Sequence, residues 1–268
     1  MADNRVALIT GAMGGIGQAI ADALAEAGCH LMLNDVAGGD EAAARCAALA
    51  EKHSVDVRFH DADLSQRAEI ERLVHDTETR LGPVDILVNN AVKRHYHNIT
   101  EFPPEAWDYA LAVGVTAPFD LTRLVLAGMQ ARGFGRIINI SSMLAMGARA
   151  GRADYVTGKT ALLGLTRATA AETVADANVT CNAILPGSVL TPIIKDRIQG
   201  LADDRGISWE DMAQRYRANL NQAGDFIEPS QIADAIRYLC SDAARAITGT
   251  SIPIDAGVSA AFTQGPAM

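Results

Sequence analysis

Several features are scarce in this 268-residue chain, and each scarcity excludes a class of protein. The four cysteines are scattered and form no CxxC pair, which argues against a disulfide framework or a zinc site and favours reduced, buried thiols. Lys and Arg number 23 against 32 Asp and Glu, so a basic surface for nucleic acid is not expected. We recognise no secretory signal and no apolar run longer than a strand, so no membrane contact is expected and a cytoplasmic location is favoured.

Short apolar segments alternate with longer helical patterns along the whole chain. Segments that are almost continuously apolar are typical of parallel strands covered on both faces. Their alternation with helices predicts a single α/β domain, residues 1–268. Its core would be a Rossmann-like, doubly wound parallel sheet of about seven strands with helices on both faces. The predicted strands are RVALIT, HLMLND, VDVRFHD, VDILVNN, GRIINIS, NVTCNAIL and TSIPID, and the predicted helices are 15–28, 39–53, 65–81, 104–132, 155–176 and 229–241.

Residues 190–226 depart from this alternation, because they are polar, charged and helical in pattern. Ser208 and Asp211 have the spacing of a capping box at the start of a helix. We therefore predict a small helical lid over a substrate site.

The stretch TGAMGGIG, residues 10–17, lies between the first predicted strand and helix. In such a turn Gly11 allows a tight bend, Gly15 lets the backbone approach a pyrophosphate, and Gly17 lets the helix pack on the strand. The start of the helix then offers free N–H groups and a positive dipole to phosphates. This pattern indicates a dinucleotide site.

Asp35 ends the second predicted strand, where an acidic residue binds the hydroxyls of the adenosine ribose. Its charge would repel the additional phosphate of NADP, and neither Gly14 nor Val36 offers a compensating positive charge. NAD is therefore the predicted cofactor. The alternative is that Asp35 merely ends a strand.

Tyr155 and Lys159 are four residues apart, so on a helix they share one face. A lysine ammonium group next to a phenol stabilises the phenolate, which can then take a proton from an alcohol. Ser142 follows an apolar strand at the edge where α/β sheets place their sites, and its hydroxyl would hold the substrate oxygen. The alternative for Tyr155 and Lys159 is that they lie on a solvent-exposed helix face and have no catalytic role.

Together these motifs resemble the short-chain dehydrogenases/reductases over nearly the whole chain. TGAMGGIG is similar to their TGxxxGxG, and Asn89-Asn90-Ala91 to their NNA. Within DADL at 61–64, the resemblance implies that Asp63 is the acid that contacts the adenine. The resemblance implies an NAD(P)-dependent oxidoreductase, commonly a homotetramer, that interconverts an alcohol and a ketone. The cofactor-binding positions that it implies are Gly11, Gly15, Ile16, Gly17, Asp35, Asp63, Leu64, Asn90, Tyr155, Lys159, Pro186, Gly187, Val189 and Thr191.

Two positions depart from the family pattern. Val92 follows Ala91 where relatives have glycine, and the bulkier side chain narrows that wall. Gly114 stands where the family has a catalytic Asn, in the helix after the fourth strand. In the family this Asn helps to hold a kink whose backbone carbonyl binds a water. Gly114 keeps the carbonyl, so we expect a modified proton relay in a working enzyme.

Within the family, the chain is most similar to the D-3-hydroxybutyrate dehydrogenases, in EFPPEAW, GFGRIINIS, SDAARAITGT and the length of the lid. Those enzymes hold a carboxylate with four polar residues, none of which is kept here. The matching positions are Arg94, Leu144, Arg152 and Arg197.

Three arginines at these positions suit carboxylate, sulfonate or phosphate oxygens, so a small anionic hydroxy compound is the predicted substrate, with no metal involved. The arginines could instead point to solvent or pair with Asp154 and Asp196. A neutral polyol, sugar or cyclic alcohol is the alternative substrate. A non-catalytic NAD-binding scaffold is a second alternative, which Ser142, Tyr155 and Lys159 argue against.

Overall fold

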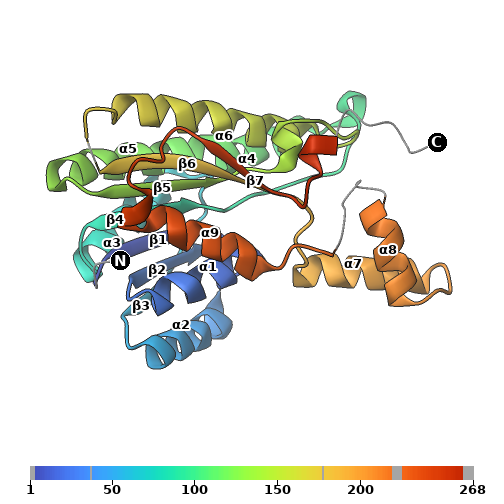
Figure 1. The fold of residues 1–268 in the computed structure, drawn as a ribbon, viewed down its shortest axis with the longest axis horizontal. Coiled ribbons are helices and arrows are strands. Elements are labelled where there is room, and N and C mark those ends of the chain that lie inside the picture. The colour runs from blue at the N-terminus through green and yellow to red at the C-terminus, as the bar shows by residue number, and fades with distance from the viewer. Residues whose placement is uncertain (1–3, 37, 177, 219–224, 262–268) are drawn as a thin grey trace.

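The computed structural model describes residues 4–36, 38–176, 178–218 and 225–261. In this part of the chain, seven parallel strands form one sheet in the order β3-β2-β1-β4-β5-β6-β7 (Figure 1). The predicted doubly wound sheet is thus confirmed. The strands are β1 (Val6–Thr10), β2 (His30–Asp35), β3 (Val57–Asp61), β4 (Val84–Asn89), β5 (Gly135–Ile140), β6 (Val179–Pro186) and β7 (Ser251–Ile254).

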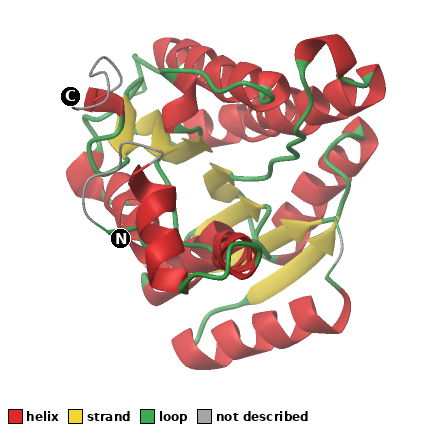
Figure 2. Cartoon of the chain, turned by 90° about the vertical axis from the view of Figure 1, so that its right-hand side faces the viewer, coloured by secondary structure: helices red, strands yellow, loops and turns green. Residues whose placement is uncertain are grey.

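Helices cover both faces of this sheet, as Figure 2 shows from the right-hand side of Figure 1. Successive side chains of β1 point to opposite faces: Ala7 and Ile9 pack with α1, α2 and α9, whereas Leu8 packs with α3 and α5. Burial on both faces is the reason why these strands are almost continuously apolar. The covering helices are α1 (Gly15–Glu26), α2 (Gly39–His53), α3 (Arg67–Arg80), α5 (Ala117–Arg132), α6 (Ala153–Glu172) and α9 (Pro229–Cys240).

The predicted helix 104–132 is interrupted. It consists of α4 (Pro104–Leu111), a π-helix (Ala112–Thr116) and α5. A π-helix inserts one extra residue into a turn and is frequent at functional sites. Gly114 lies in the middle of this π-helix, and glycine tolerates such an irregular turn.

By length and composition, the stretch Pro104–Arg132 is apolar enough to cross a membrane, although no apolar run longer than a strand was recognised in the sequence. Half of the most apolar part of this stretch is buried within the protein, and α5 packs against β4 and β5. Core packing therefore accounts for its apolar character.

The predicted lid region contains two helices, α7 (Pro192–Asp203) and α8 (Trp209–Ala218), which extend away from the sheet (Figure 1). They pack on each other through their own small apolar cluster. The Ser208 hydroxyl accepts a hydrogen bond from the backbone N–H of Asp211, at 3.0 Å, which is one half of the predicted capping box. Residues 219–224 of the predicted lid lie outside the described residues. The buried members of the cluster are Ile198, Ala202, Met212, Ala213 and Phe226.

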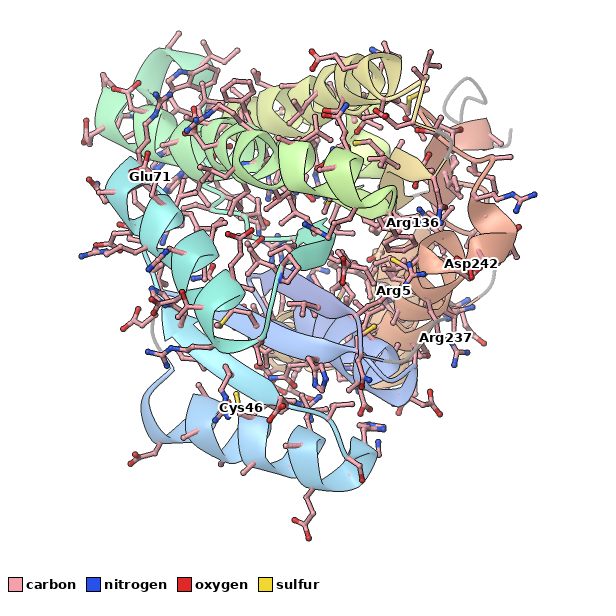
Figure 3. The ribbon with its side chains drawn as sticks, turned by 90° about the vertical axis from the view of Figure 1, so that its left-hand side faces the viewer. Arg5, Cys46, Glu71, Arg136, Arg237 and Asp242 are labelled. Atoms are coloured by element: carbon pink, nitrogen blue, oxygen red, sulfur yellow. The ribbon has the colours of Figure 1, made fainter. Side chains whose placement is uncertain are left out.

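A polar cluster closes the opposite end of the sheet, where Arg5, Arg136 and Asp242 lie near one another (Figure 3). The guanidinium carbons of Arg5 and Arg136 lie 3.1 and 4.4 Å from the centre of the Phe134 ring. Arg136 is fully buried, which lowers the pKa of its guanidinium group, and it donates to the carbonyl of Asn178 at 2.6 Å. The cluster is structural and far from the carboxyl ends of the strands.

Candidate functional site

A cavity of about 470 Å³ opens at the carboxyl ends of the strands, where open α/β sheets bind their ligands. It brings together the glycine turn after β1 with the segments that follow β2, β4, β5 and β6. Eighteen of the predicted site residues line it: Gly11, Gly15, Ile16, Gly17, Asp35, Leu64, Asn90, Arg94, Ser142, Leu144, Arg152, Tyr155, Lys159, Pro186, Gly187, Val189, Thr191 and Arg197. Asp63 and Gly114 are the two predicted residues that do not.

The glycine turn is locked to the end of β4. Gly11 has a φ of +61°, which favours glycine, and a Cβ atom there would lie 2.8 Å from the Cα of Ala91. The side-chain amide of Asn90 donates to the carbonyls of Thr10 and Gly11, at 2.9 and 2.8 Å. Asn90 thus supports the turn in addition to lining the cavity.

Asp35 lies at the expected ribose end of the cavity. One of its carboxylate oxygens accepts from the backbone N–H of Met13 at 3.1 Å, and the other from that of Val36 at 2.9 Å. Each oxygen keeps a second lone pair for a ribose hydroxyl. The neighbouring lining residues, Val36, Ala62 and Leu64, carry no positive charge that a 2′-phosphate would need. These residues fit an adenosine ribose.

Asp63 lies just outside the lining. Its carboxylate accepts from the hydroxyl of Tyr109, at 3.2 Å, and from the backbone N–H of Ser65, at 2.9 Å. The expected contact of Asp63 with an adenine ring therefore stays a prediction.

Ser142, Tyr155 and Lys159 all line the cavity. Ser142 lies two residues after the end of β5, and its hydroxyl accepts from the backbone N–H of Leu144 at 3.2 Å. Tyr155 and Lys159 lie one turn apart on α6, and the lysine Nζ is 5.7 Å from the centre of the Tyr155 ring. The Lys159 ammonium group also donates to the carbonyl of Ile140 at 2.6 Å, which ties α6 to the end of β5.

Lys159 is placed so that its charge is sensitive to what else occupies the cavity. Burial of its ammonium group, together with the nearby positive charge of Arg94, lowers the pKa of Lys159 to about 7. An anion bound next to Arg94 would offset that field and raise the pKa of Lys159 again.

Arg152 is the most buried of the three arginines, with 6% of its surface exposed. Its guanidinium carbon lies 4.2 Å from the centre of the Tyr96 ring and 4.4 Å from that of Tyr155. Its Nε atom is buried and has no hydrogen-bond partner. Asp154 does not pair with it: that carboxylate accepts from the backbone of His95 and lies 3.1 Å from the His95 ring nitrogen.

Arg197 comes from α7 in the predicted lid and reaches the same aromatic ring. Its Nη1 donates to the Tyr96 hydroxyl at 3.0 Å. Arg94 lines the cavity as well, and none of the three arginines lies within 4.0 Å of a carboxylate in the described ranges. They do not pair with Asp154 or Asp196, but Arg94 and Arg197 are exposed to solvent, as the alternative for these two states.

Sequence reasoning missed Tyr96, Lys93 and Arg149, which also line the cavity. Although partial burial acts to raise it, the pKa of Tyr96 is lowered because positive charge from Arg152 and Arg197 surrounds the phenol. Tyr96 lies in a loop, where no periodicity marks a residue as facing a site. The one available signal is the run KRHY, which follows Ala91 and Val92.

The Gly114 position makes a testable prediction, because a Cβ atom there would meet nothing within 4 Å. Gly114→Asn restores the side chain of the family pattern, so we expect turnover to be kept or raised in steady-state assays. Gly164→Asn, on the exposed face of α6 and equally free of neighbours, controls for the change in helix propensity. A severe loss confined to Gly114→Asn would show that the site needs the empty space.

Comparisons with known proteins agree with this geometry. The family model for short chain dehydrogenases matches residues 5–201. D-beta-hydroxybutyrate dehydrogenases from Cupriavidus necator and Rhizobium meliloti are each 38% identical over 96% of this chain and 98% and 99% of theirs. The solved structure of L-sorbose reductase from Gluconobacter frateurii, in complex with NADPH and L-sorbose, has a TM-score of 0.90 at 31% identity, covering 96% of this chain and 97% of that one.

The chain therefore belongs to the short-chain dehydrogenase family. It is an oxidoreductase with a Rossmann-like fold, in a family that binds a nicotinamide cofactor and acts on hydroxy and keto compounds. The relatives include a reductase solved with NADPH bound and D-beta-hydroxybutyrate dehydrogenases, so the cofactor form and the substrate have to be argued from this cavity.

Proposed function

We propose that this protein is an NAD-dependent dehydrogenase that interconverts a secondary alcohol and a ketone on a small anionic hydroxy compound. The observation that carries the proposal is the set of three arginines, Arg94, Arg152 and Arg197, that line the cavity with Tyr155 and lack a carboxylate partner in the described ranges. A planar guanidinium group binds carboxylate, sulfonate or phosphate oxygens through two parallel hydrogen bonds.

The chemistry follows from three side chains. The Ser142 hydroxyl would donate a hydrogen bond to the substrate oxygen, and the Tyr155 phenolate would take the proton of the alcohol during oxidation. Lys159 in its charged form stabilises that phenolate. A nicotinamide cofactor, when bound, supplies the hydride acceptor or donor. Arg152, next to the Tyr155 ring, would hold the anionic group of the substrate and fix the distance between that group and the reacting carbon.

The neutral-substrate alternative has one observation in its favour, which is the structural similarity to L-sorbose reductase. A panel of hydroxy acids, hydroxysulfonates, neutral polyols and cyclic alcohols, followed by NADH formation, distinguishes the two. The proposal requires that the best substrate is an anion. The scaffold alternative requires that no member of the panel is oxidised. A homotetramer remains our expectation for the assembly.

The cofactor preference makes a second prediction. Because Asp35 would bind ribose hydroxyls and repel a 2′-phosphate, we expect kcat/KM to favour NAD in the unmodified protein. Asp35→Ala should lower kcat/KM for NAD by roughly 10- to 150-fold, the range of a hydrogen bond to a charged group.

Asp35→Asn is the matched control, since it keeps an oxygen acceptor for the Met13 N–H while removing the charge. Asp35→Asn should raise kcat/KM with NADP relative to kcat/KM with NAD. Its thermal unfolding should match that of the unmodified protein, because the glycine turn keeps its hydrogen bond. Equal efficiency of the unmodified protein with both cofactors would contradict the NAD assignment.

A further inference from the structure

The cavity contains more positive charge than one anionic group requires. Besides Lys159, five basic residues line it, and none of them has an acidic partner within 4.0 Å in the part of the chain that the structure describes: Lys93, Arg94, Arg149, Arg152 and Arg197. The acidic residue of the described lining is Asp35, at the ribose end. The chain as a whole has the opposite balance, with a formal net charge of −9. Positive charge is therefore concentrated in the part of the cavity that these five residues line.

Arg152 alone can bind one carboxylate, because a guanidinium group pairs with both oxygens at once. Its burial and its unpartnered Nε mark it as the inner anion site. Arg197 nevertheless approaches the same Tyr96 ring, with both guanidinium carbons within 5.4 Å of the ring centre. Two positive charges held this close repel each other, and the binding of further negative charge relieves the repulsion.

The cofactor does not account for these residues. Its phosphates are expected at the glycine turn, Gly11–Gly17. The five basic residues instead follow Ala91, follow Ser142 or belong to α7, which are the segments on the substrate side of Tyr155.

We propose that the substrate carries two negative charges, with one anionic group on Arg152 beside Tyr155 and the second on the rim residues Arg94, Arg149 and Arg197. This inference rests on the proposed function and narrows the anionic hydroxy compound to a dianion. A hydroxydicarboxylate carries two such groups. The lid would bind part of the second anionic group, because Arg197 belongs to α7.

The test measures binding by isothermal titration calorimetry to the full-length protein saturated with NADH. Malonate, succinate and glutarate are each compared with their monomethyl and dimethyl esters, which remove one and two charges while keeping the chain. We expect at least one dianion to bind about 10-fold tighter than its monoester, which corresponds to one hydrogen bond to a charged group.

Arg197→Gln should bring that ratio close to one. Lys195→Gln removes a positive charge from the same helix at a residue outside the cavity lining and should leave the ratio unchanged.

The outcomes separate this inference from the proposed function. If each monoester binds as tightly as its dianion but tighter than the uncharged ester, the second charge is not recognised and this inference is overturned, while the proposed function stands. If the uncharged esters bind as well as the dianions, or if no anion binds, both are overturned.

Discussion

Replacing Tyr155 with Phe is expected to lower kcat on the order of 10²–10⁴-fold while leaving NADH binding intact, because the variant loses only the hydroxyl that transfers the proton. The ring itself stays beside Arg152 and Lys159, so packing in the cavity is preserved. Turnover is measured by NADH formation, and cofactor binding by fluorescence titration.

Tyr96→Phe is the matched control for this result, since it removes the hydroxyl of another cavity tyrosine. The Tyr96 hydroxyl accepts a hydrogen bond from Arg197, so its loss should raise KM more than it lowers kcat. Near-normal turnover of Tyr155→Phe would assign the acid/base role to another group. A non-catalytic scaffold would not show the expected loss at all.

Arg152→Met is expected to lower kcat/KM for the best anionic substrate by about 1.5–3 kcal/mol, or roughly 10- to 150-fold, the range of a charge-assisted hydrogen bond. Methionine fills much of the buried volume between Tyr96 and Tyr155, so the loss reports the missing guanidinium group more than a cavity. Thermal unfolding of the variant checks that the fold is kept.

Arg152→Lys serves as the control for charge alone. It keeps a positive charge but loses the planar fork, so it should fall between the unmodified protein and Arg152→Met. An Arg152→Met variant that retains full kcat/KM for the best substrate would show that no anion is held there.

Most of the fold could be predicted, and so could the position of Ser142, Tyr155 and Lys159 in one cavity, because both depend on spacing along the chain. The strand and helix bounds follow the hydrophobic pattern to within a few residues, since burial on both faces of the sheet selects apolar residues. Gly11 lies in a tight turn, and Tyr155 and Lys159 lie one helical turn apart. Both arrangements depend on residues that are close in the sequence. Of these, the structure confirms the turn and the shared helix face.

Features that depend on tertiary contact could not be predicted in this way. The π-helix at Ala112–Thr116 leaves the apolar periodicity of its segment almost unchanged, so one continuous helix was expected. Arg136 is buried in a strand read as apolar, because its charge is met by carbonyls far along the chain. Tyr96 joins Arg152 and Arg197 from a loop, and loops carry no periodic signal.

The central claim is that the cavity selects a negatively charged hydroxy compound. The most direct measurement compares NADH formation by the unmodified protein with hydroxy acids and with their own amides, such as 3-hydroxybutyrate against 3-hydroxybutyramide and lactate against lactamide. Each pair has nearly the same shape and differs by one charge. The best substrate of the series is expected to be an acid, with a kcat/KM at least about 10-fold above that of its amide. An amide that is oxidised as efficiently as its acid, or a neutral compound as the best substrate, would contradict it.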